Sequence, residues 1–493
     1  MNKIYLTTPL YYVNAAPHIG HSYTNVAADA LARYRRSKNF KVLFLTGTDE
    51  HGQKVERSAI NAGLSPIEFA DRTVDKFKDL WRKLDISYDD FIRTTEPRHI
   101  NAVQKVLDVL YKKGDIYQAK YEGWYCTPCE TFWTEVDDQV ICPDCKRPLE
   151  KISETNFFFK LSKYQDWLIK HFKENPDFVL PSFRYNEAFS FISKNKLEDL
   201  CISRPKSRLR WGIQTPFSKD HVTYVWFDAL INYISAVGYG DDNKKLKQWW
   251  PADVHFIGKD ILRQHAIYWP IMLKALELKQ PKMIVAHGWW LIGKDEAKMS
   301  KSLGNIVDPN DVISKFGIDT YRYFLLREIA FGADGKFSQE AIITRYNSDL
   351  ANDFGNLVYR SLTMVEKYYS GVIPKAKNLE NNAKIRVQIA SLSGKVEACM
   401  QKIRFSSALE VIWEVVKSAN KHVEETKPWN LAKEKKEDEL ADFIALLVEV
   451  IKEVGRQIDC FMPHTAAKIR EQFLEDKVIK GKPLFPRIES KKQ

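Results

Sequence analysis

Two histidines, His18 and His21, are the first residues whose types and spacing could do chemistry. They stand in His18-Ile19-Gly20-His21, after a strand-like stretch and at the start of a helical pattern. Residues three apart share one face of a helix, and a helix N-terminus offers N–H groups and positive potential to phosphate. Gly20 would let a nucleotide approach the backbone. The motif favours phosphate chemistry, although such a pair can also be a surface feature or two metal ligands.

A second cluster, Lys298-Met299-Ser300-Lys301-Ser302, brings two ammonium groups and two hydroxyls together. Loop-like residues flank it, so it could close over a triphosphate and neutralise its charge. The alternative is a solvated basic turn. Because the sequence has neither G-x-x-x-x-G-K-[ST] nor G-x-G-x-x-G, any phosphates must be held by other residues. These two clusters are the candidates.

Four of the seven cysteines form two pairs, Cys126-x-x-Cys129 and Cys142-x-x-Cys145. Four thiolates at this spacing can bind one tetrahedral Zn²⁺ and leave no open coordination position, so the expected metal is structural. Two redox pairs are the alternative, but neither lies in a thioredoxin-like context. The other cysteines are expected to be buried thiols: Cys201, Cys399 and Cys460.

Apolar runs that read as buried strands occupy residues 4–7, 41–46, 254–257 and 283–286, with helical stretches such as residues 25–36 between them. Strands that alternate with helices predict an α/β fold with a doubly wound, Rossmann-like parallel sheet. A polar cluster follows each strand. Because ligands of such sheets bind beyond the carboxyl ends of the strands, we expect one shared site there. Ordinary polar loops are the alternative.

The pattern along the chain predicts four segments. Two halves of a catalytic domain cover residues 1–115 and 226–349, and the second half carries the Lys298–Ser302 loop. Residues 116–225, with the cysteine pairs and many aromatics, are expected to form an inserted connective domain with a zinc knuckle. Residues 350–493 show apolar stripes at helical spacing, as in Leu440, Ile444 and Leu447, and predict an all-α helical bundle.

Composition narrows the function classes. The 493 residues carry a net charge of +11, which fits a partner such as RNA without demanding one. Apolar runs long enough for a membrane helix are absent, so no membrane partner is expected. The chain opens on a strand-like stretch without the pattern of a signal peptide. Together with the paired cysteines, this predicts a protein of the cytoplasm.

In their order and separation, His18–His21 and Lys298–Ser302 resemble the two signature motifs of the class I aminoacyl-tRNA synthetases. Within that family the methionyl branch is similar over nearly the whole chain, and a zinc knuckle belongs to that branch. The inserted region is too short for the editing domain of the valyl, leucyl and isoleucyl branches. Gln214 stands where the family usually has Pro. Further segments carry the resemblance: residues 8–14, 47–52, 224–229, 255–260 and 427–429.

The resemblance implies that ATP, with Mg²⁺, activates methionine as methionyl-adenylate and that methionine then passes to the 3' end of tRNA(Met), the initiator included. One structural Zn²⁺ is implied at the four paired cysteines. The implied catalytic residues are His18, His21, Lys298 and Lys301. The implied ATP-binding residues are His18, Gly20, His21, Gly258, Lys259, Asp260, Gly288, Lys298, Ser300 and Lys301. The implied methionine-binding residues are Leu10, Tyr12, Asp49, Trp226, Leu230, Tyr233, Ile261, His265 and Trp269. The implied anticodon-binding residues are Asn356, Arg360 and Trp429.

The chemistry of these residue types agrees. Asp49 can pair with the substrate ammonium, and aromatic rings suit a polarisable thioether. Residues 261, 265 and 269 are four apart and would share one helix face. For the aromatics, plain core packing is the alternative. Trp429 can stack on an unpaired RNA base or pack at a helix start.

Longer members of the family append a tRNA-binding module that can dimerise them, so this chain is expected to be a monomer. One rival function is that of another adenylyl-transferring enzyme of similar fold, but these are much shorter and lack a helical domain. A second rival is a non-catalytic RNA-binding protein derived from a synthetase. Retention of His18, His21, Lys298 and Lys301 argues against it.

Overall fold

A computed structural model describes residues 2–126, 131–133, 140–143, 146–292, 297–298, 307–378 and 382–489, with backbone alone at 131, 132, 297 and 298. The chain forms two compact units. Unit 1 comprises Met1–Ala28 and Arg35–His287, and unit 2 comprises Asp29–Tyr34 and Gly288–Gln493. Among the described helices, none is long and apolar enough to cross a membrane.

In the described part of unit 1, six parallel strands form one sheet in the order β3-β2-β1-β11-β12-β7. The central strands β1, β11 and β12 are mostly buried, as expected for a parallel sheet covered on both faces. This confirms the predicted parallel α/β sheet. The strands are β1 (Lys3–Tyr12), β2 (Lys41–Asp49), β3 (Asp90–Arg93), β7 (Val179–Leu180), β11 (Val254–Gly258) and β12 (Ile284–His287).

The strand order reverses at β1, which lies between β2 and β11. Tyr12 at the end of β1 pairs with Asp49 at the end of β2, and Thr7 pairs with His255 of β11. Gly258 at the end of β11 pairs with His287. The carboxyl ends of these strands therefore meet at the switch point of the sheet, where α/β folds bind their ligands.

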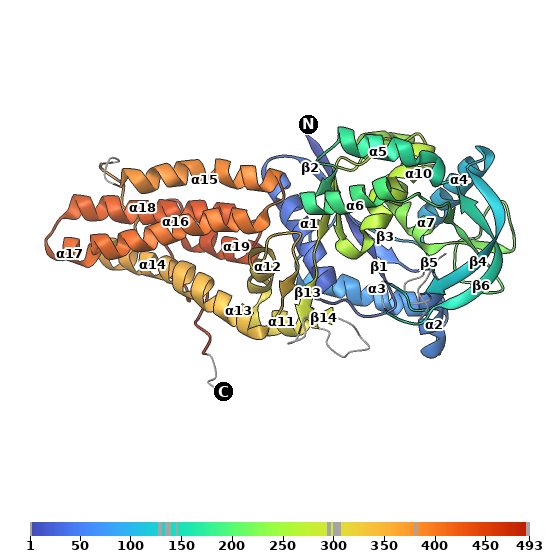
Figure 1. Ribbon diagram of the computed structural model, residues 1–493. Helices are drawn as coiled ribbons and strands as arrows, with labels where there is room; N and C mark the ends of the chain where they lie inside the picture. The colour runs from blue at the N-terminus through green and yellow to red at the C-terminus, as the bar shows by residue number, and fades with distance from the viewer. Residues whose placement is uncertain are drawn as a thin grey trace. The chain divides into compact units, whose positions relative to one another are not determined.

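Residues 116–225 contribute strands to three of the described sheets, of which two matter here. An antiparallel sheet in the order β5-β4-β6-β8 contains β4 (Ile116–Cys126), β5 (Thr131–Trp133), β6 (Glu150–Phe159) and β8 (Leu200–Cys201). Long strands β4 and β6 run side by side, as Figure 1 shows in cyan. The two-residue strand β7, from the same region, pairs with β12 of the parallel sheet. The expected insertion is thus partly continuous with the parallel sheet.

Helices of unit 1 connect the strands and supply its core. One large apolar cluster joins Tyr5 of β1 and Ile257 of β11 to the buried faces of α4 and α10. The helices are α1 (Ile19–Ser37, of which Asp29–Tyr34 count with unit 2), α2 (Gln53–Asn61), α3 (Pro66–Lys83), α4 (Pro97–Lys112), α5 (Gln165–Glu174), α6 (Ser182–Lys194), α7 (Val225–Leu230), α8 (Asn232–Ser235), α9 (Asn243–Trp249) and α10 (Trp269–Ala275). Short η helices are η1 (Ser162–Tyr164), η2 (Lys259–Ile261) and η3 (Gln264–Tyr268), and a two-stranded sheet pairs β9 (Ser203–Pro205) with β10 (His221–Thr223).

Unit 2 is mostly helical, which confirms the predicted helical C-terminal region. Helices α15, α16 and α18 pack against one another (Figure 1). The apolar stripe predicted from Leu440 onward is the buried face of α18. The helices are α11 (Pro309–Phe316), α12 (Ile318–Arg327), α13 (Gln339–Arg345), η5 (Tyr346–Gly355), α14 (Asn356–Tyr369), α15 (Ala383–Gln401), α16 (Phe405–Thr426), α17 (Pro428–Lys433), α18 (Glu437–Ile458) and α19 (Pro463–Gln472). Its described strands are β13 (Trp290–Ile292), β14 (Ala297–Lys298) and β15 (Gly335–Lys336).

A buried ion pair lies inside unit 2. The Arg322 guanidinium donates to Asp29 Oδ2 at 2.6 Å and to the carbonyl oxygens of Phe461 and Cys460. The side chains of Arg322 and Asp29 are both fully buried, and Arg33 adds a second contact to Asp29. Such a pair is tolerated in a core only when its remaining hydrogen-bonding groups are also satisfied.

Replacement of this buried cation should be costly. Arg322→Met removes the guanidinium that one carboxylate and two carbonyl groups share, and we expect it to lower the free energy of unfolding by about 3–5 kcal/mol. Urea denaturation followed by circular dichroism measures this. The control is Arg470→Met, which breaks the exposed Arg470–Asp459 pair and should cost less than about 1 kcal/mol. Equal losses in the two variants would contradict the assigned role of the buried pair.

Candidate active site at the carboxyl edge of the parallel sheet

The N-terminus of α1 is capped by its two histidines. The Gly20 N–H donates to His18 Nδ1 at 3.1 Å, and the His18 N–H donates to His21 Nδ1 at 3.2 Å. The rings stack with centroids 3.8 Å apart. Because Nδ1 accepts in both rings, each neutral imidazole carries its proton on Nε2. The cap therefore fixes two Nε2–H donors at the positive end of a helix.

Close packing in this cap explains why residue 20 is a glycine. A Cβ at Gly20 would lie 2.9 Å from His18 Cε1, so a side chain there would displace the ring. Glycine is thus required here for packing of the cap, in addition to the predicted approach of a nucleotide to the backbone. Thr24, one turn later, donates to the Gly20 carbonyl and bonds His287 Nε2 at 2.6 Å. This bond ties the first turns of α1 to the end of β12.

Asp49 and the aromatic pair Tyr12 and Trp226 form one side of the candidate site. Tyr12 and Asp49 are paired across β1 and β2. Asp49 is buried, with only 3% of its surface exposed. The rings of Tyr12 and Trp226 meet edge to face with centroids 6.1 Å apart. Residues far apart in the sequence thus bring a carboxylate beside aromatic rings, as the predicted methionine site requires.

Tyr233, His265 and Trp269 form the other side. The Tyr233 hydroxyl donates to His265 Nε2 at 2.7 Å, while His265 Nδ1–H donates to the Ile261 carbonyl at 2.9 Å. The ring of Tyr233 lies 5.7 Å from those of both His265 and Trp269. All three side chains are almost completely buried. They are held together by directed hydrogen bonds as well as by packing.

A second buried histidine supports this group from β11. Trp269 Nε1 donates to His255 Nε2 at 3.2 Å, and His255 Nδ1 bonds the Thr7 hydroxyl at 2.6 Å. Burial and the nearby His265 hold the pKa of His255 well below its ordinary value. Burial likewise lowers the pKa of His265, to about 4. Both imidazoles are therefore neutral at neutral pH, and this side of the site carries no charge from them.

The segment that carries Ile261, His265 and Trp269 is less regular than the sequence predicted. It runs through the 3₁₀ turn η2, the π-helix η3 and then α10. The expectation of one uniform helix face therefore needs correction. The residues still cooperate, because His265 bonds the Ile261 carbonyl and both His265 and Trp269 approach Tyr233. Single-turn π-helices often lie at functional sites.

Apart from those at the start of α1, the predicted ATP residues lie at the end of β11, in the turn η2 that contains Lys259 and Asp260, and in unit 2. Gly258 ends β11, and a Cβ there would lie 2.6 Å from Asp260 Oδ1, so the Asp260 side chain turns back over the strand end. Gly288 belongs to unit 2, where a Cβ would lie 2.2 Å from the Ala333 carbonyl oxygen. The backbone of Lys298 pairs with Leu291 in β13. The side chain of Lys298, and all of Ser300 and Lys301, lie outside the described residues.

Two of the four predicted zinc ligands are described. Cys126 and Cys142 are fully buried and pack in one small cluster with Leu149. Cys126 pairs with Thr131 at the end of the β4–β5 hairpin, and Cys142 exchanges backbone hydrogen bonds with Lys146 and Arg147. Cys129 and Cys145 lie outside the described residues. Over the part that is described, no group of three or more metal-binding side chains is found.

The predicted anticodon residues all belong to unit 2. Asn356 is exposed at the start of α14, and Arg360 follows one turn later. The Arg360 guanidinium pairs with Glu424 of α16 at 2.8 Å. Trp429 on α17 is 40% exposed, whereas the preceding Pro428 is buried. An exposed indole favours a binding role for Trp429 over packing at the helix start.

A hydrogen-bonded cluster beside the site was missed by sequence reasoning. The buried Asp228 carboxylate accepts from His51 and from His99, both at 2.7 Å. Next to it, Glu50 binds Arg93 in a bidentate pair. Residues 47–52 and 224–229 carry part of the family resemblance, but a single sequence gives no signal that His99 contacts them.

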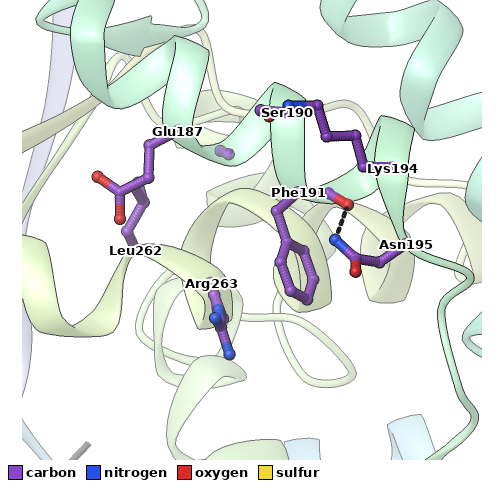
Figure 2. A pocket seen from close by; sticks show the side chains of 8 residues that line it. Glu187, Ser190, Phe191, Lys194, Asn195, Leu262 and Arg263 are labelled. Carbon is purple, nitrogen blue, oxygen red and sulfur yellow. Dashed lines mark hydrogen bonds between the residues drawn. The ribbon is translucent and has the colours of Figure 1, made fainter.

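A surface cleft of 340 Å³ lies elsewhere on unit 1, between α6 and the residues Leu262 and Arg263 that follow η2. Figure 2 shows Phe191 and Arg263 at its wall and the hydrogen bond from Asn195 Nδ2 to the Phe191 carbonyl. Arg263 lies over the Phe191 ring at 4.4 Å. None of the residues predicted to bind methionine or ATP lines this cleft. The candidate site is therefore identified by the hydrogen bonds and ring contacts among its side chains and not by this cleft.

Two family models match the chain. The model described as "tRNA synthetases class I (M)" matches residues 4–151 and 147–362, and the "Anticodon-binding domain of tRNA ligase" matches residues 382–492.

Named relatives span nearly the whole chain. It is 51% identical to a methionine–tRNA ligase of Caldanaerobacter subterraneus subsp. tengcongensis, over 99% of this chain and 79% of that protein. Identity to the methionine–tRNA ligase of Thermotoga maritima is 44%, over 99% and 81% of the two chains. A solved Mycobacterium tuberculosis methionyl-tRNA synthetase in complex with methionyl-adenylate is similar with a TM-score of 0.94 and 39% identity, over 99% of this chain and 100% of that one.

The neutral state of His265 predicts a pH dependence of stability. Its pKa is about 4 in the folded protein, against 6.5 for an ordinary histidine. As the pH falls below 6.5, the unfolded chain takes up a proton that the folded chain does not. Stability that is fully present above this pH is thus lost progressively toward pH 4, with about 2 kcal/mol lost at pH 5.

The variant His265→Asn tests this sign. Asparagine keeps a donor for the Ile261 carbonyl but does not titrate, so the loss of unfolding free energy between about pH 7.5 and about pH 5 should be smaller than in the wild type by about 2 kcal/mol. Urea denaturation at both pH values gives the comparison. Identical pH dependence in both proteins would show that His265 is not held neutral by the fold.

Proposed function

The chain belongs to the class I tRNA synthetases specific for methionine, and we propose that the residues described above activate methionine and recognise tRNA(Met). As a methionine–tRNA ligase it uses ATP to form methionyl-adenylate with release of pyrophosphate, and then transfers methionine to the 3' end of tRNA. One observation carries the residue assignment. The switch point of the sheet joins a buried carboxylate, an aromatic group and a histidine-capped helix N-terminus, from strands and loops far apart in sequence.

Methionine would bind between the two sides of this site. Asp49 would hold the ammonium group in a charge-assisted hydrogen bond. The thioether would lie among Trp226, Tyr233 and Trp269, because sulfur gains from aromatic contacts. The neutral His265 fits an uncharged side chain, since a charged imidazole there would have to be desolvated. Apolar contacts would be completed by Leu10, Tyr12, Leu230 and Ile261. The mycobacterial relative with the same fold holds methionyl-adenylate, which supports this placement.

ATP would bind with its phosphates at the N-terminus of α1. Here His18 and His21 would donate from Nε2 to phosphate oxygens, aided by the positive end of the helix. The methionine carboxylate attacks the α-phosphorus, and the bond to pyrophosphate breaks. Charge moves toward the leaving oxygens, so fixed donors and cations stabilise the transition state. Further ATP contacts are proposed for Gly20, Gly258, Lys259, Asp260, Gly288, Lys298, Ser300 and Lys301, with Mg²⁺ on the triphosphate.

The helical unit would recognise the anticodon through Asn356, Arg360 and Trp429. An exposed indole can stack on an unpaired base, while amide and guanidinium groups bond its edges. The exposure of Asn356 and Trp429 supports this proposal. A monomeric state and a cytoplasmic location stay predictions for this chain.

A structural zinc would be held by Cys126, Cys129, Cys142 and Cys145. The donor set fits, because the described members of both pairs lie at hairpin ends and share one buried cluster. Lys146, directly after the second pair, adopts a positive φ of 60°, which lets the chain turn tightly around a ligand. Bound zinc would cross-link the two hairpins and contribute folding energy.

Amino-acid-dependent ATP–pyrophosphate exchange tests the activity and its substrate together. With each of the twenty amino acids in turn, we expect exchange with methionine only. The variant Asp49→Asn should raise the KM for methionine by about tenfold or more, because it removes the charge that pairs with the ammonium group. Exchange with a different amino acid would overturn the pocket assignment. Exchange with none would favour a tRNA-binding protein without activity.

Metal analysis tests the knuckle. We expect one zinc per chain in the purified protein, and less than half of that in Cys126→Ser, because a tetrathiolate site needs all four ligands. The matched control is Cys399→Ser, a cysteine on α15 outside both pairs, which should retain the metal. Absence of zinc from the wild type, or its full retention in Cys126→Ser, would remove the proposed site.

A further inference from the structure

Asp228 is a fully buried carboxylate with two histidine donors. Its Oδ2 lies 2.7 Å from His51 Nδ1, and its Oδ1 lies 2.7 Å from His99 Nε2. The other nitrogen of His99 bonds Ser235 Oγ at 2.9 Å. The side chains of Asp228 and His99 are fully buried, and that of His51 is nearly so. Three separate segments of unit 1 therefore converge on one carboxylate: the loop after β2, helix α4 and helix α7.

Two of these segments also carry Asp49 and Trp226, which belong to the proposed methionine site. His51 stands two residues after Asp49, which would hold the ammonium group. Asp228 lies in the middle of α7, two residues after Trp226 and two before Leu230. The bond between His51 and Asp228 thus connects the segment that carries Asp49 to the helix that carries Trp226.

This connection is stiff because breaking either hydrogen bond to the buried Asp228 carboxylate costs free energy. Burial alone would raise the pKa of Asp228, but the charges and hydrogen bonds of His51 and His99 outweigh it, so the pKa lies below its ordinary value. A buried carboxylate with one donor removed is strongly unfavourable. Neighbouring contacts fix the His51 loop as well: the His51 ring lies 5.4 Å from that of Trp211, whose indole N–H donates to the Glu50 carbonyl.

We propose that Asp228 is a positioning residue that sets the distance between Asp49 and Trp226 and thereby the affinity for methionine. It touches no substrate; it acts by holding His51 and α7. This inference rests on the proposed function, because it concerns the geometry of the same methionine site. It also explains why both residues 47–52 and residues 224–229 contain polar groups that the binding assignment leaves unused.

Steady-state exchange kinetics test the proposal. Asp228→Asn should raise the KM for methionine by about tenfold or more, because small misplacements of positioning groups weaken binding strongly. The KM for ATP should change by less than about twofold. The control is Asp115→Asn, which alters another fully buried carboxylate of unit 1 with partners Lys163 and Tyr164. It should lower the melting temperature comparably and leave the KM for methionine unchanged.

A second pair of variants applies even if Asp228→Asn does not fold. In His51→Asn the amide nitrogen stands near the former Nδ1 and can still donate to Asp228, so the KM for methionine should stay close to that of the wild type. In His51→Gln the donor is displaced, so the KM should rise. Equal KM values in these two variants would overturn the proposal, as would parallel changes in the KM for methionine and ATP. Absence of methionine-dependent exchange in the wild type would instead overturn the proposed function.

Discussion

The position of β1 between β2 and β11 is the constraint on which the candidate site depends. Parallel strands end at the same edge of a sheet, and the chain leaves neighbouring strands in opposite directions where their order reverses. Here that geometry brings Tyr12 beside Asp49 on one side and places β11 and its following helical turns on the other. Helix α1 begins close to the same edge because His18 follows β1 by only a short loop.

The site buries many polar groups, and hydrogen bonds determine which of them stay neutral. His255 and His265 each use one nitrogen as a donor and one as an acceptor, which fixes their tautomers and disfavours a second proton. Asp228, by contrast, is favoured in its charged form, because His51 and His99 lower its pKa. A pocket for an uncharged thioether can thus stand beside a carboxylate for an ammonium group. This separation would let one site bind both ends of methionine.

Local patterns predicted the elements that pack as regular units. The apolar runs that became β1, β2, β11 and β12, and the histidines at the start of α1, could be recognised because each lies within a few consecutive residues. Strand β7 has two residues and shows no periodicity, so its addition to the sheet could not be predicted. The π-turn at His265 and the contact of His99 with Asp228 depend on tertiary packing. One sequence carries no signal for such long-range pairs.

A crystal structure of this chain with a non-hydrolysable methionyl-adenylate analogue would locate the adenylating site. We expect the methionine ammonium within hydrogen-bond distance of Asp49, the thioether among Trp226, Tyr233 and Trp269, and the phosphate at the histidine-capped start of α1. An analogue bound elsewhere, for example in the cleft beside Phe191 and Arg263 (Figure 2), would contradict the claim that the switch point of the sheet forms the adenylating site.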